Sequence, residues 1–260
     1  MIKHKLAIIV PYRNRAKHLI KFAPYITKYL NNQNINFKIF VIEQIEDKPF
    51  NKGLLFNVGV KLLDDSFDYV VLHDVDLLPT TLSDNVVDYS FSETPKHLIS
   101  HYIESHDNSN ILVNYLKNDN DDVMKYIKDA KIRIDKKVHL ENGFGGIVKM
   151  SIENFKQING FSNQFWGWGF EDDDLLERVK KSGLSWDRQG AGFVRSIPHQ
   201  KFDKSTNDMI FKNQQELETT KITNTNDNGY NELKDQYSLI ETKIFKLFTK
   251  ITIEVEKSYE

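Results

Sequence analysis

The chain has 260 residues, of which 40% are hydrophobic and 28% are charged, and its formal net charge at pH 7 is −2. This composition is typical of a globular protein with a substantial core, and the small net charge excludes the basic field that attracts nucleic acid. The sequence contains no cysteine, so disulfides and thiolate metal sites are excluded, and a reducing or redox-indifferent compartment is expected.

The first hundred residues alternate between apolar runs and helical patterns. The predicted elements are, in chain order, a strand at 5–12 (KLAIIVPY), a helix at 16–33 interrupted at Pro24, a strand at 37–44, a helix at 51–63 and a strand at 68–76. This alternation is typical of right-handed crossovers over a parallel sheet, so an α/β fold is expected. In such sheets ligands bind beyond the carboxyl ends of the strands.

The apolar run at 6–10 is too short to span a membrane, and it is followed by a proline and two arginines rather than by a cleavage site of small residues. No other apolar run approaches the length of a membrane span. We therefore expect neither a signal peptide nor a transmembrane segment, and a cytoplasmic location.

The second half of the chain contains one polar excursion. Residues from about 103 to 136 are polar and acidic in their middle, with a helical pattern near 122–130, and are interpreted as a solvated surface insertion. From 151 onwards the predicted elements are a helix, a Gly/aromatic loop, a helix at 171–182, short strands and a closing strand within 246–255.

Two aspartates follow the third predicted strand. Asp74 and Asp76 are two residues apart, so an extended chain places both on one face. Carboxylate oxygens suit hard divalent cations such as Mg²⁺ and Mn²⁺, which fill their remaining positions with substrate phosphates. The alternative for this short pattern is an ordinary loop or helix cap.

Four consecutive acids, residues 171–174, follow the sequence FWGWGF. Acids in a first helical turn are stabilised by the helix dipole, which is the simplest explanation of all four. That explanation does not account for Trp166 and Trp168. Aromatic rings beside carboxylates are typical of a sugar-binding cleft, in which one acid can act as a general base on a hydroxyl group. The glycines of 142–148 (NGFGGIV) allow close backbone approach to a ligand, or form a tight turn.

The order of these motifs resembles the β-1,4-galactosyltransferase family of inverting, metal-dependent nucleotide-sugar transferases. The matching segments are PYRNR at 11–15, FNKGLLFNVG at 50–59, DVDLLP at 74–79, FGG at 144–146, INGFSNQFWGWGFEDDD at 158–174 and a late His199. The closing FTKITIEV also resembles the last strand of the family. The resemblance covers nearly the whole catalytic domain, and six motifs in order are far harder to meet by chance than one.

The resemblance implies a GT-A type fold, a Rossmann-like mixed central sheet flanked by helices. It also implies a single catalytic domain over 1–260. Its parts would be a nucleotide-binding part at about 1–100, the polar insertion at about 103–136 and a donor/acceptor part at about 140–260. The residues expected to line the uridine-diphosphate pocket are Pro11, Arg13, Arg15, Phe50, Lys52, Asp74 and Val75.

The remaining site residues also follow from the resemblance. Asp76 and His199 would bind the metal, Mn²⁺ or Mg²⁺, with Asp74 and Ser196 as further candidate ligands. Gly145, Gly146 and Glu171 would contact the donor sugar. The residues expected on the acceptor side are Trp168, Gly169, Phe170, Asp172 and Asp173. The catalytic pair would be Asp172, as the general base on the acceptor hydroxyl, and Glu171; Asp174 is interpreted as a helix-dipole acid.

Three departures from the family pattern bear on the substrate. Ser196 replaces a methionine ligand, and a harder oxygen ligand there widens the tolerance for Mg²⁺. Gly143 replaces a bulky residue that screens the C2 substituent of the donor, so UDP-GalNAc competes with UDP-galactose as the expected donor. Phe170 replaces a glycine beside the acceptor, so the family's usual acceptor, N-acetylglucosamine, does not carry over.

The expected function is transfer of galactose or N-acetylgalactosamine from a UDP-sugar to a hydroxyl of a glycan or glycolipid acceptor. The expected product has a β-linkage, with 1,4 as the expected position. Two alternatives are a non-catalytic carbohydrate-binding protein on the same scaffold and a metal-dependent nucleotide-sugar hydrolase. The sequence has neither an N-terminal anchor nor cysteine, which favours a soluble bacterial or viral member that contacts the cytoplasmic membrane face only peripherally. The sequence does not fix the oligomeric state.

Overall fold

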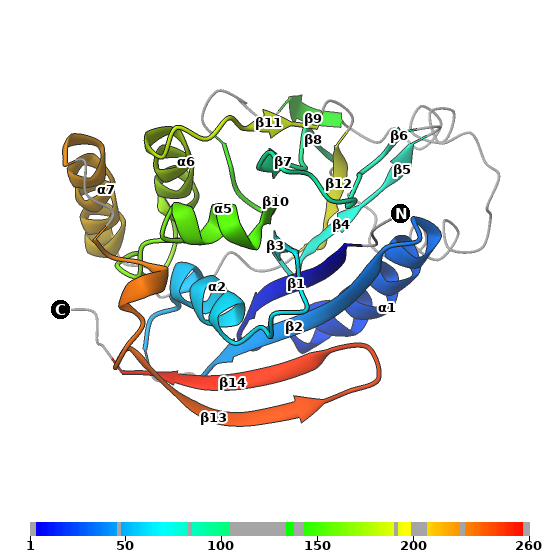
Figure 1. Cartoon of the computed structure of the whole chain (residues 1–260), viewed down its shortest axis with the longest axis horizontal. Coiled ribbons are helices and arrows are strands. Elements are labelled where there is room, and N and C mark those ends of the chain that lie inside the picture. The colour runs from blue at the N-terminus through cyan, green and yellow to red at the C-terminus, as the bar shows by residue number, and fades with distance from the viewer. Residues whose placement is uncertain are drawn as a thin grey trace.

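The computed structural model describes residues 4–45, 48–82, 85–103, 134–137, 143–189, 192–198, 207–223 and 227–256. An eight-stranded mixed sheet lies at the centre of this part of the chain, with helices on both faces (Figure 1). A four-stranded sheet and a two-stranded sheet lie beyond one end of it. The order of the central sheet is β11-β7-β10-β3-β1-β2-β14-β13.

The predicted strands and crossovers of the N-terminal half are confirmed. The elements are β1 (Lys5–Tyr12), α1 (Ala16–Asn32), β2 (Asn36–Gln44), α2 (Lys52–Lys61) and β3 (Tyr69–His73). Both β2 and β3 pair with β1 in parallel, so the carboxyl ends of all three strands meet at one edge. The prediction that Pro24 interrupts the first helix is wrong, because α1 continues through it. Apolar side chains buried on both sides of Pro24 hold the helix to the sheet despite one lost backbone hydrogen bond.

The remaining elements complete the three sheets. The other strands of the central sheet are β7 (Lys96–His97), β10 (Ile147–Ser151), β11 (Asp187–Arg188), β13 (Tyr237–Ile244) and β14 (Thr249–Val255). The strands of the smaller sheets are β4 (Leu77–Pro79), β12 (Phe193–Ser196), β8 (His101–Ile103), β9 (Ile134–Lys137), β5 (Thr81–Leu82) and β6 (Asn85–Val86). The helices of this half are α5 (Ile152–Gln157), α6 (Glu171–Lys181), α7 (Asn207–Ile222) and the short 3₁₀ helix η1 (Tyr230–Glu232).

Two of these elements depart from the expected pattern. Helix α7 falls where only short strands were predicted, and β13 precedes the predicted closing strand β14 as its antiparallel partner. The polar insertion falls largely outside the described residues, including the helix expected near 122–130. Its two ends pair as the antiparallel strands β8 and β9.

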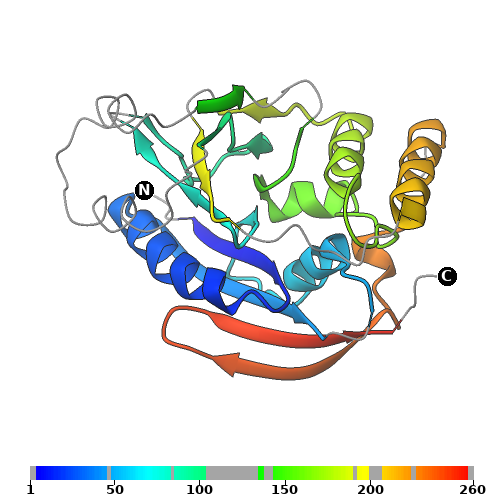
Figure 2. The same cartoon turned by 180° about the vertical axis from the view of Figure 1, so that it is seen from behind.

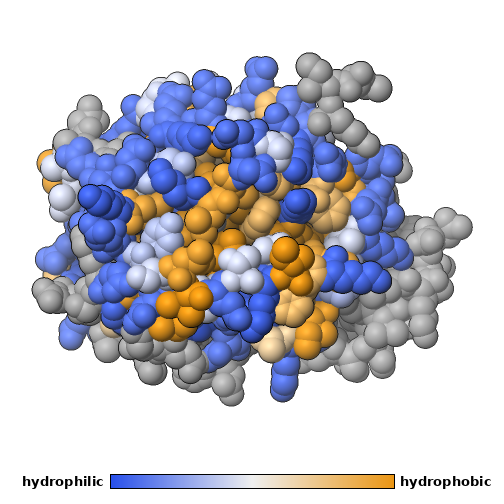
Figure 3. Space-filling view, turned by 60° about the horizontal axis from the view of Figure 1, so that its bottom comes forward, coloured by the Kyte–Doolittle hydropathy of each residue, from blue (hydrophilic) through white to orange (hydrophobic). Residues whose placement is uncertain are grey.

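The core has two halves, one on each face of the sheet. Successive side chains of β1 point to opposite faces, so Ile8 and Ile9 belong to different buried clusters. Helix α1 covers one face (in front in Figure 2) and α2 the other (in front in Figure 1). The β13–β14 hairpin extends the sheet at its outer edge, and Figure 3 shows apolar side chains gathered on that side of the molecule. No helix in the described part of the chain combines the length and apolar character needed to span a bilayer.

Candidate active site

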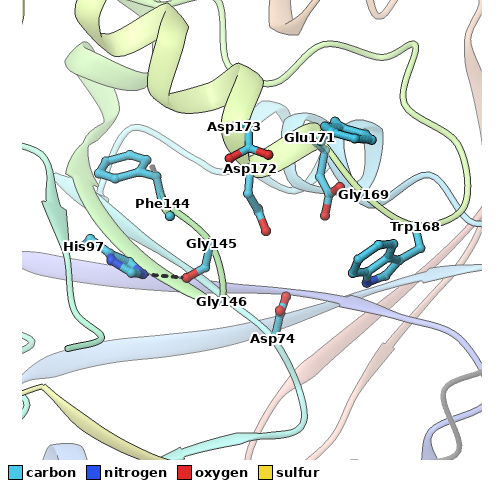
Figure 4. Close-up of a pocket in the computed structure, with 12 residues that line it drawn as sticks. Asp74, His97, Phe144, Gly145, Gly146, Trp168, Gly169, Glu171, Asp172 and Asp173 are labelled. Carbon is cyan, nitrogen blue, oxygen red and sulfur yellow. Dashed lines mark hydrogen bonds between the residues drawn. The ribbon is translucent and has the colours of Figure 1, made fainter. Parts of the chain in front are cut away.

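A cavity of about 340 Å³ opens beyond the carboxyl ends of β1 and β3 (Figure 4). Its walls come from the end of β3, from β7, from the loop before β10, and from the loop and first turn of α6. The lining residues are Asp74, His97, Gly143, Phe144, Gly145, Gly146, Trp168, Gly169, Phe170, Glu171, Asp172 and Asp173. The folded chain therefore brings one predicted nucleotide-binding residue, Asp74, and the predicted donor-sugar, acceptor and catalytic residues, from three separate motifs, to one cavity.

Lys52 lies at the meeting point of three carboxylates. Its Nζ is 3.1 Å from both oxygens of Asp172 and 3.3 Å from Oε1 of Glu171. The nearest oxygen of Asp74 is 3.4 Å away. Lys52 begins α2 and Asp74 follows β3, whereas the other two acids begin α6. In Figure 4 the side chains of Asp172 and Glu171 point from the helix towards Asp74, which points back from the sheet.

Burial and the neighbouring charges shift the pKa values of the ionisable groups in this cluster. Burial lowers the pKa of Lys52, but the carboxylates of Asp172, Asp74 and Glu171 outweigh it and raise that pKa well above its usual value. Burial raises the pKa of Asp74, which Lys52 opposes. Burial and then the neighbouring Asp172 raise the pKa values of Glu171 and Asp173. A single ammonium group thus serves three carboxylates, which leaves the cavity with excess negative charge.

Gly145 is in tight contact with Asp172. A β-carbon on Gly145 would overlap the carboxylate of Asp172, so any other residue at this position would displace that side chain. The next residue, Gly146, has a φ of 80°, a conformation that favours glycine, and its carbonyl accepts a 2.8 Å hydrogen bond from the backbone N–H of Asp74. The two glycines therefore set the distance between the end of β3 and the start of α6.

His97 and Arg188 hold the loop of residues 143–146 (the glycine loop), and the sequence did not predict a role for either of them. Nε2 of His97 donates to the carbonyl of Gly145 at 2.8 Å, while Nδ1 accepts from Nε of Arg188 at 2.9 Å. Nη2 of Arg188 also donates to the carbonyl of Gly143. Burial lowers the pKa of His97 to about 4, so it is neutral. Neither residue belongs to a recognisable motif, and their strands are only two residues long, so the sequence offers little signal.

The predicted nucleotide-binding residues lie in and after the end of β1, around the start of α2 and directly after β3. The guanidinium carbon of Arg13 lies 5.2 Å from the ring centre of Phe50, and Nη1 of Arg15 lies 3.5 Å from a carboxylate oxygen of Asp76. Pro11 in β1 and Val75 after β3 are buried.

The proposed metal ligands fall only partly within the described residues. No three His, Cys, Asp or Glu side chains in that part of the chain gather as a metal-binding group, and His199 lies outside it. The backbone N–H of Ile197 donates to the carbonyl of Asp76 at 2.7 Å, so the strand that ends at Ser196 leads directly past Asp76. The hard oxygen donors of Asp76 and Asp74, together with the excess negative charge, fit Mn²⁺ or Mg²⁺.

The loop of residues 165–170 before α6 (the tryptophan loop) exposes one of its two tryptophan rings and buries the other. The side chain of Trp168 is 70% exposed at the rim of the cavity, whereas Trp166 is in the core. Asn213 of α7 holds the loop, because its Nδ2 donates to the carbonyls of Trp166 (2.9 Å) and Gly169 (3.1 Å). Phe170, which caps α6, has a φ of 73°. This left-handed conformation explains why a glycine is usual in the family pattern at this position.

Comparison with known proteins places the chain in a family. The pattern described as the N-terminal region of glycosyl transferase group 7 matches residues 1–87, and the pattern described as the N-terminal domain of galactosyltransferase matches residues 129–200. Together they cover more than half of the chain. The chain belongs to the β-1,4-galactosyltransferase family. The resemblance noted in the sequence is thereby confirmed.

Relatives in this family are similar along most of the chain. β-1,4-Galactosyltransferase 7 of Drosophila melanogaster is 33% identical over 82% of this chain, and β-1,4-galactosyltransferase 6 of Rattus norvegicus is 35% identical over 75%. The matches span only 58% and 44% of those relatives. Both relatives are animal proteins and give no support to the expectation of a bacterial or viral member.

Solved structures confirm the GT-A fold of the galactosyltransferase family. The catalytic domain of the Drosophila galactosyltransferase 7, in complex with xylobiose, has a TM-score of 0.73 at 27% identity. A variant of the same enzyme in complex with manganese, UDP-Gal and xylobiose has a TM-score of 0.71. Each likeness covers 98% of this chain and 95% of the solved chain.

Several residues of the galactosyltransferase motifs are structural. Asn51 caps α2 and also donates to the carbonyl of Asn163, while Asn57 donates to the side chain of Asn163 at 2.8 Å. Asp174 lies in the first turn of α6, as the interpretation as a helix-dipole acid requires, and it also forms a buried ion pair. Its side chain is fully buried and pairs with Nε of Arg178 at 2.6 Å, because it points into the protein one turn before that arginine.

Proposed function

We propose that this chain is an inverting, metal-dependent glycosyltransferase that moves galactose or N-acetylgalactosamine from a UDP-sugar to a hydroxyl of a glycan acceptor, through a β-1,4-type reaction. The observation that carries the proposal is the cavity in which Asp172, Glu171 and Asp74 surround Lys52, with Gly145 packed against Asp172. The similar Drosophila enzyme has been crystallised with manganese, UDP-Gal and xylobiose. A donor sugar and an acceptor of these classes suit the cavity chemically, and the nucleotide and the metal suit the residues that follow β1 and β3.

On the donor side, the chain offers positive charge and hard ligands. Arg13, Arg15 and Lys52 supply cationic groups for a diphosphate, and the ring of Phe50 offers an apolar face to the uracil. Asp76 and His199 would hold the metal, with Asp74 and Ser196 nearby. When bound, Mn²⁺ or Mg²⁺ would neutralise charge on the departing diphosphate.

On the acceptor side, Asp172 acts as the general base. Its carboxylate, held by Lys52, accepts the proton of the acceptor hydroxyl, and the oxygen attacks the anomeric carbon from the face opposite the diphosphate. The bond to UDP breaks as the new glycosidic bond forms, so the configuration inverts. Trp168 stacks on the acceptor, Asp173 accepts its hydroxyl hydrogen bonds, and Glu171 holds the donor sugar.

The donor sugar is the finer part of the proposal. Gly143 lines the cavity without a side chain, which leaves space beside the C2 position. The carbonyl of Gly143 is fixed by Arg188, so the loop does not depend on a side chain there for its position. This space favours tolerance of an N-acetyl group in addition to the hydroxyl of galactose.

Calorimetric titration tests the donor assignment. The protein is titrated with UDP-Gal, UDP-GalNAc and UDP-glucose, each with Mn²⁺ and with EDTA. We expect metal-dependent binding of UDP-Gal, and of UDP-GalNAc if the space at Gly143 is used. Asp76→Ala should abolish the metal-dependent part of donor binding. Unchanged affinity for metal and nucleotide in Asp76→Ala would show that Asp76 is not a metal ligand. If the wild-type protein bound none of the three donors, the proposal would be contradicted.

Product analysis separates transfer from the two alternatives. With UDP-Gal, Mn²⁺ and xylobiose, a transferase forms a galactosylated trisaccharide with a β-linkage. A hydrolase releases free sugar at the same rate with and without xylobiose, and a non-catalytic binding protein turns over nothing. A cytoplasmic location and peripheral membrane contact stay predictions, which cell fractionation would test.

A further inference from the structure

Strand β13 forms the outer edge of the central sheet in the part of the chain that the structure describes (Figure 1). It is eight residues long, and every residue after Tyr237 is exposed. Its inner edge pairs with β14, so its outer edge presents a row of backbone hydrogen-bonding groups. Natural proteins usually shorten, charge or cover such an edge, because it can pair with another strand.

The exposed side chains of β13 and the following turn are unusually apolar. Ile244 is 85% exposed, Leu239 and Ile240 are each 54% exposed, and Phe245 is 46% exposed. Figure 3 shows apolar residues gathered on this side of the molecule. A cluster of this kind on an unpaired strand is typical of an interaction surface.

The charges on β13 are self-complementary. Glu241 and Lys243 are two residues apart and pair with each other at 2.8 Å. We propose that β13 pairs with β13 of a second copy of this chain, antiparallel and centred on Thr242. In that arrangement Glu241 of each copy faces Lys243 of the other, Ile240 faces Ile244, and the two sheets join into one.

The neighbouring registers are disfavoured. A two-fold axis perpendicular to the joined sheet requires residues on the same face to oppose each other, so the pairing must be centred on a residue. Centring on Glu241 would oppose the two glutamates, and centring on Lys243 would oppose the two lysines; like charges directly opposite are destabilising. The β-bulge between Leu239 and Glu241 limits regular pairing to about residues 240–244. We therefore expect a weak, concentration-dependent dimer.

The dimer would leave both active sites open, because β14, β2 and β1 separate β13 from β3. The inference does not rest on the proposed function, and its test does not measure activity. It uses the purified 260-residue chain and sedimentation equilibrium over a range of protein concentrations.

Charge reversal at the strand gives a sharp test. Glu241→Lys and Lys243→Glu each oppose like charges twice in the homodimer, so each should raise the dimer dissociation constant by at least about tenfold. An equimolar mixture of the two variants should dimerise again, since each lysine then faces a glutamate. Lys221→Glu is the matched control, because Lys221 also pairs with a neighbouring acid on the surface, and it should leave the dimer unchanged.

Three outcomes would overturn the inference: a wild-type chain that is monomeric at every concentration, a dimer indifferent to both charge reversals, or a mixture that fails to re-form it. Sedimentation with phosphatidylserine vesicles completes the test. Suppose that the wild-type chain binds the vesicles while forming no dimer in solution, and that Ile244→Lys abolishes that binding. This result would assign the apolar surface to a membrane instead of to a second copy of the chain.

Discussion

Asp172 is the side chain on which the proposed reaction depends most directly. Both of its oxygens lie 3.1 Å from Nζ of Lys52, and Gly145 packs against it without a β-carbon. Asp172→Asn keeps the shape but cannot accept a proton. We expect the rate of transfer to fall by about 10²–10⁴-fold while donor binding is retained, because a base acts mainly in the transition state.

Initial rates and calorimetric titration with UDP-Gal measure the two effects in Asp172→Asn. Asp208→Asn is a matched control, since Asp208 is also an acid in the first turn of a helix but is exposed, and it should change neither. Near-normal transfer by Asp172→Asn would show that another group is the base.

Phe170 stores backbone strain at the start of the acid-bearing helix. Its φ of 73° is a conformation that costs a residue with a side chain about 1–2 kcal/mol. Phe170→Ala and Phe170→Gly both remove the ring, but only glycine also removes the strain. We expect the glycine variant to unfold in urea with a free energy about 1 kcal/mol higher than the alanine variant. An alanine variant as stable as the glycine variant would contradict a left-handed residue at this position.

At the scale of elements, the sequence predicted those that carry strong patterns. Strands β1, β2 and β3 each contain a run of apolar residues, and α6 combines acids at its start with an apolar face. Helix α7 was missed because its buried stripe contains polar residues, Asn213 and Thr220, whereas Phe211 on it is exposed. Strand β13 was missed because its apolar residues do not alternate regularly between a buried and an exposed face.

The sequence likewise predicted only part of the candidate site. The acids and glycines could be predicted because they stand in motifs with fixed spacing. The support by His97 and Arg188 could not, because long-range folding brings these isolated residues under the glycine loop. The role of Asn213 was also inaccessible, since it depends on the position of a helix that the sequence did not predict.

Helix α7 holds the tryptophan loop through one buried amide. Asn213 donates to two carbonyls of the loop, and its Oδ1 accepts from the backbone N–H of Trp166. Asn213→Leu preserves volume but leaves these groups unpaired, which costs about 1–3 kcal/mol of stability. We also expect KM for the acceptor to rise, acrylamide quenching of tryptophan fluorescence to increase and the donor affinity to stay constant.

The matched control for Asn213→Leu is Gln214→Leu, an exposed change of the same chemical kind on the same helix. It should alter neither the quenching nor KM. Loss of stability in Asn213→Leu with an unchanged KM for the acceptor would mean that Asn213 only stabilises the fold.

At the scale of the whole molecule, buried neutral histidines make the folded state sensitive to acid. Burial lowers the pKa values of His73 and His97 to about 4, from a usual value of 6.5. Between these pH values the unfolded chain binds more protons than the folded one, so the free energy of unfolding falls as the pH decreases from 6.5 towards 4. Each histidine should remove about 2 kcal/mol by pH 5.

His97→Gln isolates one of these contributions. A glutamine amide can donate to the carbonyl of Gly145 and accept from Arg188 as the neutral imidazole does, but it does not titrate. Carboxylates with raised pKa values, such as Glu171, oppose the effect in both proteins, so the comparison cancels them. Urea unfolding at pH 7 and pH 5 should therefore show a smaller loss of stability on acidification in His97→Gln than in the wild type. Equal losses would mean that His97 accepts a proton in the folded protein as easily as in the unfolded chain, and its bond from Arg188 would then not fix it in the neutral form.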